Sequence, residues 1–320
     1  MELNEIYAPI REDLARVKAE LASIGDIDLP WLSGKWGYLV KGSGKGMRPT
    51  LTLLAGKFYN YDMAYLLPMA VSVELMHTST LVHDDAIDNS EMRRGYPTVN
   101  SIWGDDVAIL LGDYLFAKAA EYVADTQSPR AIKLFSQTLG IISSGEINQF
   151  FAAFNMEQTR DDYIKRISGK TASLFSLATE SGALLSEAPQ EAVSALKAYG
   201  YNLGIAFQIV DDILDFTSTE EELGKPIGSD LAQGTLTLPA MLILERYPEA
   251  NPVRKYLETR DEEHLAPAIE RARQEDIVNE CYRVATDYCQ QACRNLDTLP
   301  EGETRQIFRE LADYVVRRKE

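Results

Sequence analysis

The sequence has few of the residues that mark several large classes of protein. Only three of its 320 residues are cysteine and only three are histidine. Cys281, Cys289 and Cys293 are odd in number and lie within one C-terminal helical stretch, so a disulfide framework is not expected. Cys289 and Cys293 have no second cysteine pair or adjacent histidine, so we interpret them as helix packing residues instead of zinc ligands.

Long hydrophobic runs and an excess of basic residues are also missing. No run of 18 apolar residues occurs, the first five residues (MELNE) do not resemble a signal peptide, and the basic residues 317–319 are too few for a membrane anchor. We therefore expect a cytoplasmic protein without stable membrane insertion. The 32 Lys and Arg residues against 49 Asp and Glu residues give a formal charge of −17, which argues against a nucleic-acid partner because phosphate backbones require a basic face.

Apolar residues recur three and four positions apart through most of the chain, which is the spacing of a buried helix face. No period-two alternation is flanked by hairpin turns, and no linker or internal repeat divides the sequence. We therefore predict an all-α fold, with residues 1–320 forming a single domain. The helical patterns lie near residues 4–23, 46–59, 67–88, 104–124, 129–150, 160–185, 189–217, 235–246, 264–297 and 303–318.

Two aspartate motifs stand at the ends of long apolar helical segments. They share the spacing Asp-Asp-x-x-Asp and comprise Asp84, Asp85 and Asp88 and, 127 residues later, Asp211, Asp212 and Asp215. Carboxylates four residues apart lie on one helix face and repel each other unless a cation offsets them. Oxygen ligands of this kind favour Mg²⁺ held jointly by the protein and a substrate phosphate. The repetition of the motif favours a metal-dependent diphosphate site over two solvated helix ends.

Two other metal or phosphate motifs do not fit. Neither aspartate motif has the alternating acids, glycine and distal glutamate of a calcium-binding EF-hand loop. Lys45 is followed by Gly46 in place of Ser or Thr, and Ile164 occupies the first-glycine position ahead of Lys170. Calcium buffering and a Walker-type nucleotide site are therefore disfavoured.

Basic residues lie near the aspartate motifs despite the acidic total. They occur in or beside glycine-containing turns, where they can bind phosphate oxygens, and comprise Lys45, Arg48, Arg93, Arg94, Lys170 and Lys225. His77 lies two turns before Asp84 and is a candidate diphosphate donor, whereas we assign His83 to packing. Gln208 lies one turn before Asp211 and either faces the same cavity or is a satisfied core residue.

At these motifs the sequence resembles the trans-isoprenyl diphosphate synthases of the polyprenyl synthetase family. The matching strings are GKGMRP at 44–49, ELMHTSTLVHDDAIDNSEMRRG at 74–95, GKTASLF at 169–175, FQIVDDILDF at 207–216 and GKPIGSDLAQGTLTLP at 224–239. The resemblance covers nearly the whole chain and implies a bundle of long helices around a deep cavity, usually in a homodimer, with the two motifs facing each other across its mouth. Thr235 stands where many members carry a second lysine, which affects one contact to the allylic diphosphate.

The resemblance also implies a role for each matching residue. The six aspartates bind Mg²⁺ that bridges the allylic diphosphate, and together with Lys170 they are the catalytic residues. The residues at the allylic diphosphate are Arg93, Lys170, Thr171, Gln208 and Lys225. Of these, Thr171 and Gln208 line the reaction centre. The second substrate, isopentenyl diphosphate, is bound by Lys45, Arg48, His77 and Arg94. In the implied prenyltransferase reaction the allylic C–O bond ionises, the isopentenyl double bond attacks, and loss of a proton gives a product longer by one prenyl unit.

The helix before Asp84 is expected to measure product length. One helical turn rises about 5.4 Å, roughly the span of one prenyl unit. Ser79 and Thr80, one turn before the first aspartate, are small where short-chain members often carry aromatic residues, and Met76 is the next candidate floor. We predict an all-trans product of pentaprenyl size or longer, with geranylgeranyl or farnesyl diphosphate as the alternative.

Two other functions compete with this one. A terpene cyclase normally has Asn, Ser or Thr, and Glu in its second metal motif, whereas this chain repeats the aspartate form. A non-catalytic partner subunit of a heteromeric synthase is expected to have lost aspartates or the Arg93, Arg94 pair, and this chain retains them all. A catalytic synthase is therefore favoured.

Overall fold

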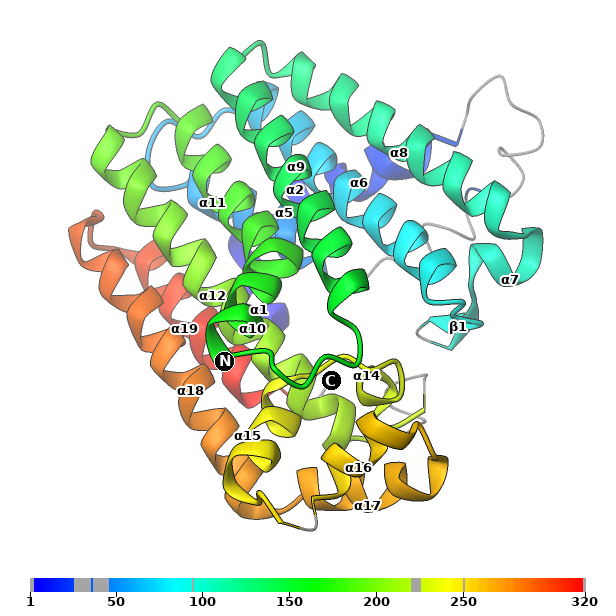
Figure 1. Ribbon diagram of the computed structural model, residues 1–320. Helices are drawn as coiled ribbons and strands as arrows, with labels where there is room; N and C mark the ends of the chain where they lie inside the picture. Colours follow the sequence, from blue (N-terminus) through cyan, green and yellow to red (C-terminus); the bar gives the residue numbers. More distant parts are fainter. Residues whose placement is uncertain are drawn as a thin grey trace. The chain divides into compact units, whose positions relative to one another are not determined.

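The computed structural model describes residues 3–25, 36, 46–93, 95–219, 226–249 and 251–318. Regular secondary structure in these residues is helical, apart from one antiparallel pair of two-residue strands, β1 (Met92–Arg93) and β2 (Tyr96–Pro97). The prediction of an all-α fold is confirmed, as the ribbon shows (Figure 1). None of the helices in this part of the chain has the length and apolar character needed to cross a membrane.

The chain forms two compact units, each made of segments that are discontinuous in the sequence. Unit 1 contains Met1–Leu139, Leu174–Gly200 and Asn295–Leu311, and unit 2 contains Gly140–Ser173, Tyr201–Arg294 and Ala312–Glu320. The assignment of residues 1–320 to one domain stays a prediction. Helices with residues in both units include α9 (Pro129–Ala152), α12 (Gln190–Thr217) and α19 (Glu303–Arg317).

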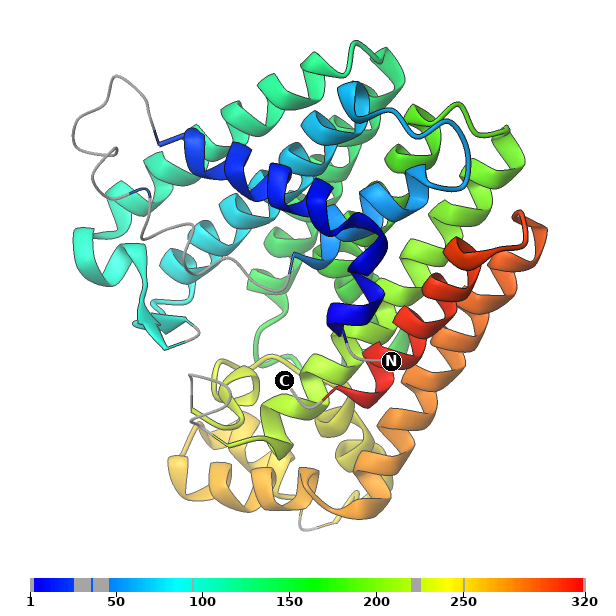
Figure 2. The same cartoon turned by 180° about the vertical axis from the view of Figure 1, so that it is seen from behind.

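Unit 1 is organised around α6 (Met63–Ile87), which is buried along most of its length. The Asp62 side chain caps this helix by accepting a hydrogen bond from the Ala64 N–H at 2.9 Å. Helix α6 packs against α5 (Met47–Gly56) and α8 (Asp105–Asp125), and α2 (Arg11–Ser23), dark blue in Figure 2, also lies against it. The other helical elements of unit 1 are α1 (Leu3–Ile6), η1 (Ala8–Ile10), α2 (Arg11–Ser23), α5 (Met47–Gly56), α7 (Val99–Trp103), α8 (Asp105–Asp125), α11 (Ser173–Leu185) and η4 (Leu296–Thr298).

Helices α6 and α8 approach each other closely at Gly112. A Cβ atom at this position would lie 2.1 Å from the His83 ring, so any larger residue would require the imidazole to move. The Ser79 hydroxyl donates to the Gly112 carbonyl at 2.7 Å, and a ring nitrogen of His83 lies 3.0 Å from the Ile109 carbonyl. These contacts fix the last turns of α6, which carry the first aspartate motif, against α8.

Unit 2 contains α10 (Arg160–Ile167), a short helix with a well-defined start. The Thr159 hydroxyl accepts from the Asp162 N–H at 3.2 Å, and the Asp162 carboxylate accepts from the Thr159 N–H at 3.0 Å. These reciprocal bonds form a capping box. Helix α10 continues directly into the π turn η2 (Ser168–Ala172) and then into α11. The other helical elements of unit 2 are α14 (Ser229–Ala232), α15 (Leu238–Arg246), α16 (Pro252–Thr259), η3 (Glu262–His264), α17 (Leu265–Ala272) and α18 (Glu275–Asn295).

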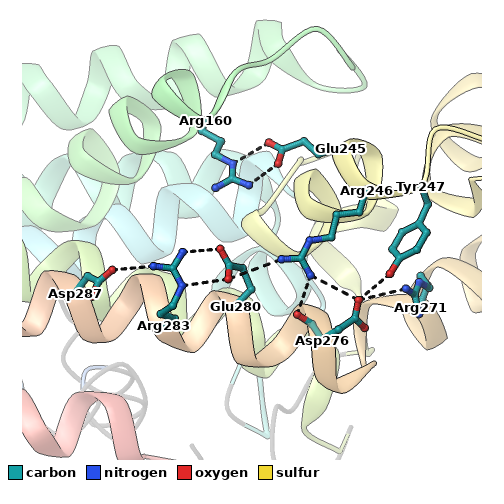
Figure 3. A network of polar contacts seen from close by, with 9 residues as sticks. All are labelled: Arg160, Glu245, Arg246, Tyr247, Arg271, Asp276, Glu280, Arg283 and Asp287. Carbon is teal, nitrogen blue, oxygen red and sulfur yellow. Dashed lines mark hydrogen bonds and ion pairs between the residues drawn. The ribbon is translucent and has the colours of Figure 1, made fainter.

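Ion pairs connect α10 with α15, and both α15 and α17 with α18, on the surface of unit 2 (Figure 3). The Arg160 guanidinium pairs with both carboxylate oxygens of Glu245, and its Nε donates at 2.8 Å. Asp276 accepts a hydrogen bond from the Tyr247 hydroxyl at 2.7 Å and lies 3.4 Å from Arg271. Exposed pairs of this kind each contribute up to about 1 kcal/mol. Among them, the Arg160–Glu245 pair joins the first turn of α10 to α15.

Candidate active site

The first aspartate motif lies at the C-terminal end of α6 in unit 1. Asp84 and Asp85 are buried, whereas Asp88 is the exposed C-cap residue. Arg93 Nε donates to the two carboxylate oxygens of Asp85 at 2.8 and 2.9 Å, and Arg93 Nη2 lies 2.8 Å from Asp85 Oδ1. Burial raises the pKa of Asp85, and the hydrogen bonds and charge of Arg93 act against that rise. The structure thus brings Arg93 to the first motif, where the sequence analysis expected a cation.

A short hairpin places Arg93 at this point. Gly95 adopts a φ of +79° in the turn between β1 and β2, a conformation that glycine adopts without strain. The Thr98 hydroxyl donates to the Ser90 carbonyl at 2.6 Å, and the Asn100 side-chain amide donates to the same oxygen at 3.1 Å. The loop after the motif is therefore closed by hydrogen bonds at its base, and Arg93 returns toward the end of α6.

In unit 2, Asp212 of α12 is at the centre of a buried polar network. It accepts hydrogen bonds from the Tyr163 hydroxyl at 2.7 Å and from Gln208 Nε2 at 2.9 Å, and Gln208 Oε1 accepts from the Thr171 hydroxyl at 2.5 Å. Burial raises the pKa of Asp212 to about 7, the charge of Asp230 adds to the rise, and the bonds from Gln208 and Tyr163 oppose it. A cation beside this carboxylate would offset the cost of its burial.

Asp211 and Asp215, the other members of the second motif, are held by residues from two further segments. Arg318, at the end of α19, donates to Asp211 Oδ1 at 2.5 Å and to the Phe207 carbonyl at 2.8 Å. Its guanidinium also lies 3.8 Å above the Phe207 ring. The buried Asp215 accepts a hydrogen bond from the Ser229 hydroxyl at 2.9 Å. Each aspartate of the second motif is thus oriented by a residue outside the motif.

Lys170 and Thr171 lie in the π turn between α10 and α11. Turns of this kind occur often at functional sites. Lys170 Nζ lies 3.1 Å from Glu146 Oε1 and donates to Glu146 Oε2 at 3.2 Å. Thr171 reaches the second motif through Gln208. Thr171 therefore belongs to the hydrogen-bond chain that ends at Asp212, whereas Lys170 pairs with Glu146.

Arg48 and His77, the described candidates for isopentenyl diphosphate binding, are half-buried on α5 and α6 of unit 1. The Arg48 guanidinium lies 5.0 Å above the ring of Phe175, which α11 supplies. The other two candidates for this diphosphate, Lys45 and Arg94, lie outside the described residues, as does Lys225. The roles of these three residues stay predictions.

The candidate residues for product length differ in their exposure. Met76 and Ser79 are fully buried, and the Ser79 hydroxyl is bonded to α8 as described above. Thr80 is half-buried, and its hydroxyl donates to the His77 carbonyl at 2.8 Å. A larger side chain at Ser79 would have to separate α6 from α8. Thr80 still has exposed surface, so a larger side chain there has room toward solvent.

Comparison with known proteins decides the family. Residues 29–273 match the family model described as polyprenyl synthetase. The chain belongs to this family. Component 2 of the heptaprenyl diphosphate synthase of Bacillus subtilis is 38% identical over 100% of this chain and 92% of its own length.

Two solved structures are also similar to this polyprenyl synthetase. A decaprenyl diphosphate synthase from Rhodobacter capsulatus has 35% identity and a TM-score of 0.91, with 98% of each chain covered. A heptaprenyl diphosphate synthase from Staphylococcus aureus has 32% identity and a TM-score of 0.92, with 100% of this chain and 99% of that chain covered. The family resemblance seen in the motifs is thus confirmed.

The aspartates of this polyprenyl synthetase have the donor chemistry that Mg²⁺ requires. Within the described residues, no three His, Cys, Asp or Glu side chains gather into a complete metal site. Mg²⁺ usually takes only one or two protein carboxylates and completes its octahedron with water and substrate phosphate oxygens. One or two carboxylates, such as Asp84 and Asp88 one turn apart at the end of α6, therefore fit this ion.

Three residues of the site were missed by sequence reasoning. Tyr163 occupies an apolar position in a helical pattern, and nothing there distinguishes it from a core residue. Arg318 belongs to the basic end of the sequence, but only 8% of its surface is exposed. Glu146 belongs to no aspartate motif, although it lies on the helix that faces Lys170. The available sequence signal for Arg318 was weak: a lone cluster of basic residues at the end of an amphipathic helix.

Proposed function

We propose that this polyprenyl synthetase condenses isopentenyl diphosphate with an allylic diphosphate, head to tail, and forms an all-trans polyprenyl diphosphate of pentaprenyl size or longer. The observation that carries the proposal is that both aspartate motifs are intact at the ends of α6 and α12, each with an ordered set of hydrogen-bonding partners. The heptaprenyl and decaprenyl synthases that the chain resembles support the product class.

In this proposal the residues of the two motifs hold the Mg²⁺ that makes the allylic diphosphate a better leaving group. Bound Mg²⁺ would supply the positive charge that stabilises the diphosphate as the C–O bond ionises. Arg93 and Lys170 are the described cations that would bind the remaining diphosphate oxygens, while Arg48 and His77 would bind isopentenyl diphosphate. Apolar side chains buried along α6 and α12 would limit the access of water, which would otherwise quench the carbocation.

The proposal is tested by incubating the purified protein with Mg²⁺, isopentenyl diphosphate and, separately, dimethylallyl, geranyl, farnesyl and geranylgeranyl diphosphates. Product lengths are then read by mass spectrometry. Products longer than geranylgeranyl diphosphate are expected. Products that end at farnesyl or geranylgeranyl diphosphate would correct the chain length but keep the reaction, and a lack of elongation with every primer would contradict a self-sufficient enzyme.

A second candidate is that the chain is the catalytic component of a two-component synthase. The description of the Bacillus subtilis relative as component 2 of its enzyme favours this candidate. We propose the homodimer as the simpler assembly, because Ile109 and Leu110 on α8 are 49% and 69% exposed and offer an apolar face to a second copy. Light scattering gives the mass of the assembly that the purified chain forms, and the elongation assay gives its activity. An active dimer of one chain needs no second component, so the two measurements together distinguish the candidates.

Replacing Thr80 with phenylalanine is expected to shorten the product by at least one prenyl unit. Thr80 is half-buried one turn before Asp84, so a phenylalanine there adds bulk at a position that still has exposed surface. One prenyl unit matches about one turn of the helix. The measurement is the product distribution by mass at fixed substrate ratio.

Thr78→Phe is the matched control for the Thr80 variant. Thr78 is also a half-buried threonine of α6, but two positions along a helix correspond to opposite faces. Its product length should equal that of the unmodified protein. Equal shortening in both variants, or none in Thr80→Phe, would show that this face of α6 does not determine length.

A further inference from the structure

Tyr163 and Asp212 form a buried contact between two helices of unit 2. The two side chains belong to residues that are 1% and 2% exposed, and the Tyr163 hydroxyl donates to Asp212 Oδ2 at 2.7 Å. Water cannot readily replace either partner at this depth, so loss of the bond would leave an unsatisfied polar group. Tyr163 lies on α10, outside every motif that identified the family.

The carboxylate of Asp212 is oriented by donors on both oxygens. Gln208 Nε2 donates to Oδ1 at 2.9 Å, while Tyr163 donates to Oδ2. Two donors on different oxygens fix the plane of the carboxylate, and each oxygen keeps a second lone pair for another partner. A metal ligand held in this way loses little conformational freedom when the ion binds.

Tyr163 is itself held in place by its neighbours. The Arg166 guanidinium lies 5.5 Å from the centroid of the Tyr163 ring, and Arg166 donates to the Leu236 carbonyl at 2.5 Å and to Gln158 at 3.0 Å. The capping box at the start of α10 and the Arg160–Glu245 pair fix the other end of the helix. The hydroxyl is therefore presented to Asp212 by a rigid element.

We propose that Tyr163 is a positioning residue for Mg²⁺ binding, which acts by holding the Asp212 carboxylate in one orientation. The inference rests on the proposed function of the aspartate motifs and extends it to a residue outside them. Tyr163 donates to the ligand and does not itself touch the metal or the substrates. Its removal should therefore weaken metal binding more than it slows the reaction at saturating metal.

The test is Tyr163→Phe, which removes only the hydroxyl oxygen. Calorimetric titration of the full-length protein with Mg²⁺ in the presence of inorganic diphosphate should show an affinity about 10- to 100-fold lower, the usual cost of losing a partner of a metal ligand. The Mg²⁺ concentration for half-maximal prenyl transfer should rise by a similar factor, with a smaller change in kcat. Wild-type Mg²⁺ affinity and Mg²⁺ dependence in this variant would overturn the proposal.

Tyr199→Phe is the matched control. Tyr199 is fully buried in unit 1, and its hydroxyl donates to the Phe308 carbonyl at 2.6 Å, so this variant also loses one buried hydrogen bond. The two variants should lose similar thermal stability, but Tyr199→Phe should keep the Mg²⁺ affinity of the unmodified protein. An equal loss of Mg²⁺ affinity in both variants would indicate a general structural effect and contradict the proposal.

A double-mutant cycle with Asp212→Asn separates a direct effect from an indirect one. If Tyr163 acts through Asp212, Tyr163→Phe should change Mg²⁺ affinity little once Asp212 is already replaced. Additive losses would contradict the proposal. Because the titration uses inorganic diphosphate, it also separates this inference from the proposed function: a protein inactive with every primer can still show the Tyr163 effect, and an active one can lack it.

Discussion

Asp212→Asn is expected to lower kcat/KM for prenyl transfer by about a thousandfold, the scale on which loss of a group that stabilises developing charge reduces an enzyme's rate. Asparagine keeps the shape of the side chain but removes the negative charge that binds the cation. The measurement is the initial rate with isopentenyl and farnesyl diphosphates over a range of Mg²⁺ concentrations. Asp276→Asn, at a surface aspartate of the same unit, is the control and should keep full activity.

The same substitution should also change how the stability of the folded protein depends on pH. Burial raises the folded-state pKa of Asp212 from 3.8 to about 7, so ionisation of this group opposes folding. Because the folded protein holds this proton more tightly than the unfolded chain, protonation of Asp212 adds to the free energy of unfolding. This contribution is fully present below pH 3.8 and is lost as the pH rises to about 7. Asparagine does not ionise, so the stability of the variant relative to the unmodified protein should increase over this interval and then level off. Thermal unfolding in EDTA from pH 4 to 8 measures it, and a variant less stable at pH 8 than at pH 4, relative to the unmodified protein, would contradict this account.

The long helices could be predicted because hydrophobic spacing reports which face of a helix is buried. Patterns near residues 104–124 and 189–217 correspond closely to α8 and α12. The prediction of one helix over residues 264–297 was wrong, since α17 ends at Ala272 and α18 begins at Glu275. Apolar spacing continues across this break, from Ile269 to Ile277, and conceals it. The acidic first turn of α18 is the local signal of a new helix start.

The candidate site was predictable only where its residues are close in sequence. Arg93 follows Asp85 by eight residues, so one turn can return it to the motif. Tyr163 is 49 residues from Asp212, and Arg318 is 107 residues from Asp211. Such contacts depend on how helices pack, and single-sequence periodicity does not specify which helices become neighbours. A tyrosine at an apolar position carries no mark of the carboxylate that its hydroxyl will meet.

Helix packing in unit 1 likewise depends on a residue that periodicity overlooks. Gly182 of α11 lies against α5, where an added Cβ atom would be 2.2 Å from the Thr52 carbonyl oxygen and 3.0 Å from Ala55 Cβ. The nearer atom belongs to the backbone and cannot rotate away, so the two helices would have to separate. Gly182→Ala is therefore expected to destabilise the protein by about 3 kcal/mol, at the upper end of the usual cost of overpacking. Urea unfolding followed by circular dichroism measures the loss.

Gly140→Ala makes the same chemical change with the opposite expected sign. Gly140 is an exposed residue of α9 with no atom within 4 Å of an added Cβ, so alanine should stabilise its helix by up to about 1 kcal/mol.

Helix α5 carries Arg48 and α11 carries Phe175, whose ring lies below the Arg48 guanidinium. Separation of these helices by Gly182→Ala should therefore also raise the KM for isopentenyl diphosphate, whereas Gly140→Ala should not. A stable Gly182→Ala protein with an unchanged KM would show that α5 and α11 can shift without disturbing Arg48.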